Sequence, residues 1–233
     1  MVENIKLTAH ELKRYLKVSI YLPNDYNNTD RDYNVIYILD GQLMFHSLND
    51  NNKVFDLPSI LDEANAKIVC IAIHSPDNND WRLSEVCPYY KLDETLVDPS
   101  LSYNFLNYII NILHPLMLGR YRITDNAYLL GLKESAILPL YANYHNPFFQ
   151  GVGLFSPKLD ICENYLNDLD NNFDASKRLF LRSNNDNLVN ELIDKLKSLG
   201  IDELNYELDN DNINEYDLLK KYIIDFYNFV NKR

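Results

Sequence analysis

Candidate reactive side chains lie together where one predicted strand ends and a predicted helix begins. Lys133, Glu134 and Ser135 follow one another directly at this point. A serine hydroxyl becomes a nucleophile for acyl transfer when a neighbouring base takes its proton. Lys133 is a poor base for Ser135, because residues two apart at a helix start point in different directions. His46 and His74 follow predicted strands and can reach the same edge of a sheet, which leaves a rearranged hydrolytic centre as one hypothesis.

The remaining histidines favour structural roles. The chain has five histidines, and none lies after His145. His145 and His114 lie at predicted helix ends, where a histidine commonly bonds to the last carbonyl groups. Any histidine-dependent chemistry must therefore use the first two thirds of the sequence.

Neither a metal nor a cofactor is expected. Asp209, Asp211 and Glu215 are spaced somewhat like the ligands of a calcium loop, but the central glycine and the ligand register of such a loop are missing. The three cysteines are scattered and lack metal-ligand spacing, which favours reduced, buried thiols.

Composition and charge exclude several classes of partner. The net charge is −12 and no basic stripe interrupts it, so we expect no binding to nucleic acid or to anionic membranes. No apolar run approaches the roughly 20 residues of a membrane-spanning helix. Residues 1–13 are polar and do not have the pattern of an export signal, which predicts a cytoplasmic location. With 46% hydrophobic and 24% charged residues, the chain fits one globular domain over residues 1–233.

Strand and helix patterns alternate along this domain. Period-two alternation predicts a half-buried edge strand at residues 17–22, whereas continuous branched apolar runs predict strands buried on both faces. Seven strands are expected, at 17–22, 35–39, 68–73, 127–130, 152–155, 179–181 and 204–208. Helical spacing predicts helices at 57–64, 101–118, 134–144, 187–199 and 214–230. The alternation indicates a mostly parallel sheet with helices on both faces and a site beyond the carboxyl ends of its strands. The longest irregular stretch, 75–99, is expected to overhang that site.

Several segments resemble one known family in their order and spacing. They are V-S-I-Y-L-P at 18–23, V-I-Y-I-L-D-G-Q at 35–42, Trp81-Arg82 through Glu85 to Pro88, H-P-L-M-L-G-R-Y-R-I at 114–123, Y-L-L-G at 128–131 and F-F-Q-G-V-G-L-F-S-P at 148–157. Together they resemble the putative-esterase family of α/β hydrolases, which includes S-formylglutathione hydrolases, enterochelin-type siderophore esterases and mycolyltransferases. The resemblance implies the α/β-hydrolase fold, in agreement with the periodicity.

The resemblance places the catalytic turn of the family, written G-x-S-x-G, at residues 131–135. Lys133 stands where the serine nucleophile is expected, Glu134 follows it, and Ser135 replaces the second glycine. The retained Gly131 favours survival of the turn. A non-glycine residue at positive φ costs about 1 kcal/mol, however, so without a serine to present the turn is free to relax.

The other parts of the implied catalytic machinery are altered as well. The family has a histidine just before its last helix, and here the corresponding position is Asn212, which cannot accept and return a proton. Asp186 is the candidate for the catalytic acid, although a helix cap is the simpler interpretation.

A binding pocket is still expected. Asp40-Gly41-Gln42 matches the first oxyanion loop of the family, and such a site uses backbone N–H groups that side-chain substitution does not remove. The predicted oxyanion and ligand pocket is lined by Gly41, Gln42, Trp81 and Leu132. Lys133 and Glu134 are expected at its floor, paired with each other, or on an exposed first helical turn.

Three functional hypotheses follow. The favoured one is an esterase homologue that is inactive by the Ser-His-Asp route and is retained to bind a small molecule or a protein. The second is an active carboxylic-ester hydrolase that uses Ser135 with His46 or His74. The third is a structural subunit, which the 18 tyrosines favour because tyrosine is enriched at interfaces. By analogy with relatives, a homodimer is the expected assembly.

Overall fold

The computed structural model describes residues 1–45, 55–88, 101–161, 165–209 and 215–232. Eight strands of this part of the chain form one sheet in the order β1-β2-β4-β3-β5-β6-β7-β8. They are β1 (Val2–Ala9), β2 (Arg14–Tyr21), β3 (Tyr33–Ile38), β4 (Val69–Ile73), β5 (Ile123–Leu132), β6 (Phe149–Phe155), β7 (Arg178–Asn184) and β8 (Glu203–Asp209). The β1/β2 and β2/β4 pairs are antiparallel, and every other pair is parallel.

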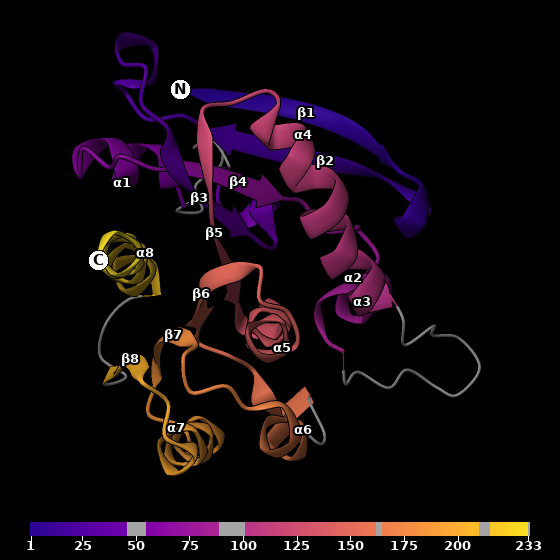
Figure 1. Ribbon diagram of the computed structural model, residues 1–233, viewed down its shortest axis with the longest axis vertical. Helices are drawn as coiled ribbons and strands as arrows, with labels where there is room; N and C mark the ends of the chain where they lie inside the picture. Colours follow the sequence, from indigo (N-terminus) through magenta and orange to yellow (C-terminus); the bar gives the residue numbers. More distant parts are fainter. Residues whose placement is uncertain (46–54, 89–100, 162–164, 210–214, 233) are drawn as a thin grey trace.

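The helices pack on both faces of this sheet, as predicted. They are α1 (Leu57–Glu63), α2 (Asn79–Val86), α3 (Leu101–Tyr108), α4 (His114–Leu118), α5 (Ile137–His145), α6 (Tyr165–Asn172), α7 (Asn187–Leu199) and α8 (Glu215–Asn231). Helices α1 and α8 share one hydrophobic core, while α3 to α7 pack in the core of the opposite face (Figure 1). No helix among the described residues combines the length and apolar character that crossing a membrane requires.

The prediction of an edge strand at residues 17–22 is wrong. Strand β2 lies between β1 and β4, and β1 is the edge. Residues along β1 alternate between exposed and half-buried, because Ile5 and Leu7 pack against the core while their neighbours face solvent. This period-two pattern lies within the polar start of the chain, and the sequence analysis does not predict β1 from it.

The structure differs from the prediction in three further places. Within the stretch predicted to be irregular, Asn78 accepts a hydrogen bond from the Trp81 N–H and starts α2, while residues 89–100 lie outside the described residues. The single helix predicted at 101–118 contains a π-helical turn, Ile109–Leu113, just before Pro115. Proline cannot donate a hydrogen bond to the preceding turn and its ring crowds the carbonyl four residues earlier, and both effects disturb the regular α-helical hydrogen bonding there. Helix α6 was not predicted.

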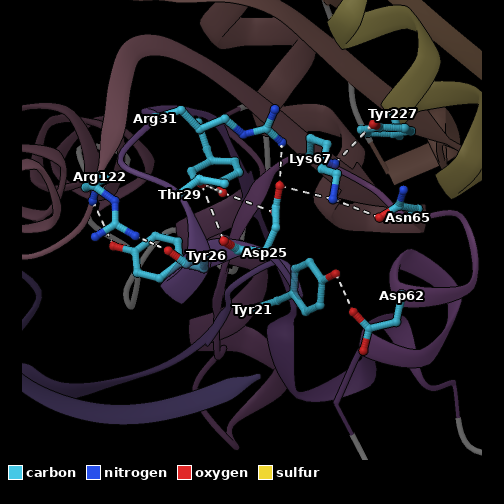
Figure 2. Close-up of polar contacts among 11 residues, drawn as sticks. Tyr21, Asp25, Tyr26, Thr29, Arg31, Asp62, Asn65, Lys67, Arg122 and Tyr227 are labelled. Carbon is cyan, nitrogen blue, oxygen red and sulfur yellow. Dashed lines mark hydrogen bonds and ion pairs between the residues drawn. The ribbon is translucent and has the colours of Figure 1, made fainter.

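A polar cluster joins the amino ends of the central strands, opposite the predicted site. Asp25, in the β2–β3 connection, accepts a hydrogen bond from Tyr33 Oη at 3.1 Å. The same carboxylate pairs with Lys67 Nζ at 3.1 Å, and Figure 2 shows the two side chains pointing toward each other. The backbone N–H of Lys67 donates to Tyr227 Oη of α8 (3.1 Å). Burial alone would raise the pKa of Asp25, but the hydrogen bonds from Lys67 and Tyr33 and the charge of Arg31 lower it. These contacts hold together the amino ends of the central strands. The predicted site lies at the opposite, carboxyl ends.

Candidate functional site

The turn after β5 keeps a tight, strained shape. Lys133 has φ 55°, in the left-handed region, so of the two outcomes left open by the sequence the turn has survived and has not relaxed. Gly131 is required just before it, because a Cβ at this position would lie 2.1 Å from the backbone oxygen of Ser135. The backbone N–H of Lys158 donates to the Lys133 carbonyl at 3.2 Å, which ties the turn to the chain after β6.

Ser135 faces into this turn. Its hydroxyl donates to the Leu132 carbonyl at 2.8 Å and accepts from the Leu132 N–H at 3.0 Å. The residue has no exposed surface. Ser135 therefore acts as a cap that closes the turn.

Left-handed residues end three adjacent strands of the sheet. Asp40 (φ 54°) follows β3, Lys133 follows β5 and Ser156 (φ 46°) follows β6. Left-handed residues other than glycine are uncommon, and they cluster where backbone strain serves a site. This repeated geometry marks the carboxyl edge of β3, β5 and β6 as the functional rim.

A buried ion pair stands at one end of that rim. Asp40 is fully buried and accepts from Arg82 Nε at 2.8 Å and from Arg82 Nη2 at 2.6 Å. The Ser75 hydroxyl donates to the same carboxylate. The pKa of Arg82 is raised, mainly by its hydrogen bonds to Asp40, although burial opposes the shift. The guanidinium therefore stays charged, and the pair fixes α2 against the end of β3.

Glu134 continues this network on the other side of Arg82. Its carboxylate lies 3.2 Å from Arg82 Nη2 and 3.0 Å from Lys158 Nζ, with its side chain only one fifth exposed. Burial alone would raise the pKa of Glu134, but hydrogen bonds from Lys158, from its own backbone N–H and from Arg82 together lower it. Glu134 is thus a half-buried, ion-paired group and does not lie on an exposed turn.

Glu134 also uses a donor that an oxyanion would need. The N–H after the apex residue is one of the two oxyanion donors in this type of turn. Here that N–H is hydrogen-bonded to the Glu134 carboxylate. The Glu134 side chain therefore competes for this donor.

A pocket of about 280 Å³ opens on the other side of Lys133, toward α8. It is lined by Leu132, Lys133, Ser156, Asn184, Leu218, Leu219 and Tyr222. Tyr222 also donates its hydroxyl to Asp209 at 2.9 Å. Ser156, Asn184 and the α8 residues were not predicted as site residues; the F-S-P segment offered the one sequence signal, since it ends a buried strand.

The predicted oxyanion loop lies apart from this pocket. Gly41 is packed so closely on β4 that a Cβ would lie 2.5 Å from the Ala72 carbonyl carbon. Gln42 accepts from the Ser75 N–H at 3.0 Å. Trp81 lies on α2 and is 37% exposed. Of the predicted pocket residues, Leu132 and Lys133 line the pocket, whereas Gly41, Gln42 and Trp81 lie outside its described lining.

The remaining candidates have other contacts. Asp186 caps α7, accepting from the N–H groups of Leu188 (2.9 Å) and Val189 (3.3 Å). His74 Nε2 lies 2.9 Å from the Ser19 hydroxyl of β2. Asn212 and His46 lie outside the described residues.

Several of the solved structures similar to this chain are hydrolases by their names. An IroE-like serine hydrolase from Shewanella oneidensis is 18% identical, with a TM-score of 0.79 over 98% of this chain and 79% of that one. The BES protein from Bacillus cereus is 18% identical, with a TM-score of 0.70 over 100% and 96%. The enterobactin esterase FES from Shigella flexneri is 17% identical, with a TM-score of 0.75 over 99% of this chain and 60% of its own. At such identities the likeness establishes the α/β-hydrolase fold.

Comparison with curated proteins found no match. The model of one family, described as "Putative esterase", matches residues 9–201. That match includes every strand from β2 to β7 and the turn at Lys133. The chain therefore belongs to the putative-esterase family of α/β hydrolases.

Proposed function

We propose that this protein is a member of the esterase family that binds a small molecule at the carboxyl rim of its sheet without hydrolysing esters by the Ser-His-Asp route. The observation that carries the proposal is the amine of Lys133 at the apex of a turn that keeps its strained shape. Strain of this kind costs about 1 to 3 kcal/mol and persists where the surrounding structure and the function maintain it.

The neighbours of Lys133 support a binding role. Ser135 uses both hydrogen-bonding functions of its hydroxyl within the turn. The carboxylate of Glu134 holds the adjacent backbone donor. An ester bound here would meet neither an activated hydroxyl nor an uncommitted backbone donor after the apex, while the pocket on the other side of the turn remains available to a ligand.

The test is an assay of the purified full chain with p-nitrophenyl acetate, p-nitrophenyl butyrate and a fluorophosphonate probe. We expect no turnover above background and no covalent labelling. Two matched variants, Ser135→Ala and Ser156→Ala, control for a displaced nucleophile. Turnover that is proportional to protein concentration and is abolished by either substitution would establish the rearranged esterase instead.

A further inference from the structure

Strand β1 is the outermost strand at one end of the sheet and forms a basic hairpin with β2. We propose that the outer edge of β1 binds an extended segment of a partner protein in which acidic and apolar residues alternate. The segment adds to the sheet as a further antiparallel strand. This surface is separate from the pocket beside Lys133, so the inference does not rest on the proposed function.

The first residue of the chain shows which backbone groups of β1 face outward. Met1 and Leu22 exchange two hydrogen bonds, each 2.9 Å long. In an antiparallel ladder such pairs recur at every second residue, so the odd-numbered residues of β1 bond to β2. The N–H and C=O groups of the even-numbered residues therefore point away from β2, along the outer edge of the sheet (Figure 1). An incoming strand can pair with these groups, which belong to Val2, Asn4, Lys6 and Thr8.

The side chains on one face of this edge are basic. Lys6 lies directly opposite Lys17 of β2, and both residues are exposed. Their pair is of the type without hydrogen bonds, in which side chains approach closely, so the like charges repel each other. The Lys6 ammonium lies 4.2 Å from the ring centroid of Tyr15, a contact that leaves its charge in place. Within the described part of the chain no carboxylate pairs with Lys17. A carboxylate of a bound segment would relieve the repulsion.

The rest of the hairpin does not neutralise these lysines. Residues 1–22 contain four basic and two acidic side chains, in a chain whose net charge is −12. Glu3 lies on the other face of β1, where it accepts from Tyr121 Oη at 2.8 Å. Glu11 lines a hollow against α3. The hairpin is therefore a local positive patch, and charge complementarity favours an acidic ligand.

The positive patch continues to the tip of the hairpin. His10 and Lys13 line a hollow of about 360 Å³ there, next to Thr8. Arg14 lines the hollow as well, but its guanidinium is held by Glu85 through two hydrogen bonds of 2.7 Å. A strand paired along β1 would reach this hollow at its end, so that a further acidic side chain could meet Lys13.

The opposite face of the edge is apolar. Ile5 and Leu7 are half-buried and pack against the core. Cross-strand neighbours on one face contact each other, so apolar residues of the ligand would cover Ile5 and Leu7 while its acidic residues lie beside Lys6. A second copy of β1 fits less well. Pairing of two centred β1 strands about a two-fold axis would place both Lys6 side chains on one face, opposite or diagonal to each other.

The experiment measures the fluorescence anisotropy of a fluorescein-labelled peptide, G-E-V-E-V-E-V-G, titrated with the full chain. We expect saturable binding that weakens at least about fivefold when the NaCl concentration is raised from about 50 to about 500 mM. The charge-reversed peptide G-K-V-K-V-K-V-G should bind at least about tenfold more weakly, although the net charge of the protein attracts it. The peptide G-E-E-E-V-V-V-G has the same composition without the alternation and should also bind more weakly.

Substitutions in the hairpin separate charge from backbone pairing. Lys6→Glu combined with Lys17→Glu should abolish binding of the acidic peptide and create binding of the charge-reversed one. Lys220→Glu combined with Lys232→Glu changes the net charge equally at the far end of the sequence and should keep the preference of the wild type. Thr8→Pro removes an outward N–H that the sheet does not use, so it should weaken peptide binding about tenfold with little change in the thermal midpoint.

Three peptide results would overturn the inference: no saturable binding of the acidic peptide at millimolar concentration, equal affinity for the acidic and charge-reversed peptides, or unchanged affinity in Lys6→Glu with Lys17→Glu. A dimer of the wild-type chain in sedimentation velocity that Thr8→Pro dissociates would also overturn it, because a second copy would then occupy the edge. None of these results depends on ester turnover, so the inference and the proposed function can fail separately.

Discussion

Arg82 donates two hydrogen bonds, 2.8 and 2.6 Å long, to the carboxylate of Asp40, although the two residues are 42 positions apart in the sequence. This contact connects α2 to the end of β3 and brings the guanidinium within reach of Glu134. A buried carboxylate held in this way depends on its partner, because losing one member of the pair leaves an uncompensated charge.

Arg82→Met should therefore destabilise the protein by about 3 to 5 kcal/mol. Denaturation with urea measures this loss. The double variant Asp40→Asn with Arg82→Met should recover part of it, since the buried charge is gone. The control is Arg31→Met, whose exposed pair with Asp25 should contribute less than about 1 kcal/mol. Equal losses for the two single variants would contradict this role of Arg82.

Gly131, just before the turn after β5, can be compared with Gly200 at the end of α7 and Gly119 at the end of α4. Gly131→Ala should prevent folding or cost several kcal/mol, because the new Cβ would overlap the Ser135 carbonyl. Gly200→Ala has open space but a positive φ, so it should cost about 1 kcal/mol. Gly119→Ala, with neither obstacle, should be neutral or stabilising. Thermal denaturation of the three variants checks the order.

Relieving the strain at Lys133 should stabilise the fold. Glycine adopts a positive φ without steric cost, so Lys133→Gly should gain up to about 1 kcal/mol, reduced by the greater freedom of glycine in the unfolded chain. Lys17→Gly, in the extended backbone of β2, should lose about 0.5 to 1 kcal/mol. A loss at both positions in urea denaturation would mean that the side chain of Lys133 stabilises the turn more than its backbone strains it.

His114 should make the fold sensitive to mild acid. It is buried beside Phe148, with Nδ1 2.9 Å from the Tyr37 hydroxyl, and burial lowers its pKa despite the nearby Asp125. Below about pH 6.5 the unfolded chain binds a proton that the folded protein resists, so stability present at higher pH falls as the pH drops.

Urea denaturation at pH 7.5 and 5.5 measures this effect. The loss of stability on acidification should be smaller in His114→Gln than in the wild type, by up to about 1 kcal/mol. His10→Gln, at an exposed position, is the control and should keep the loss of the wild type. If His114→Gln loses as much stability on acidification as the wild type, the acid sensitivity arises from the carboxylates.

The buried parallel strands were predictable, because a short, continuous apolar run rich in branched residues, such as that of β4, is typical of a strand covered on both faces. The strand-to-helix turn was predictable for the same reason, since Gly131 follows such a run. The pairing of Asp40 with Arg82 was not predictable, because pairing between residues distant in the sequence leaves no local pattern. The conformation of Lys133 was also beyond a sequence argument: propensity favours relaxation, whereas contacts through Gly131, Ser135 and Lys158 determine the backbone.

Because Asp40, Lys133 and Ser156 all hold left-handed conformations after adjacent strands although their side chains differ in size and charge, the contour of this rim does not require one particular type of side chain. Exchanging those side chains alters reactivity while the scaffold stays in register. The rim is therefore a suitable place to introduce a reactive group by substitution, because the backbone geometry that would present the group already exists.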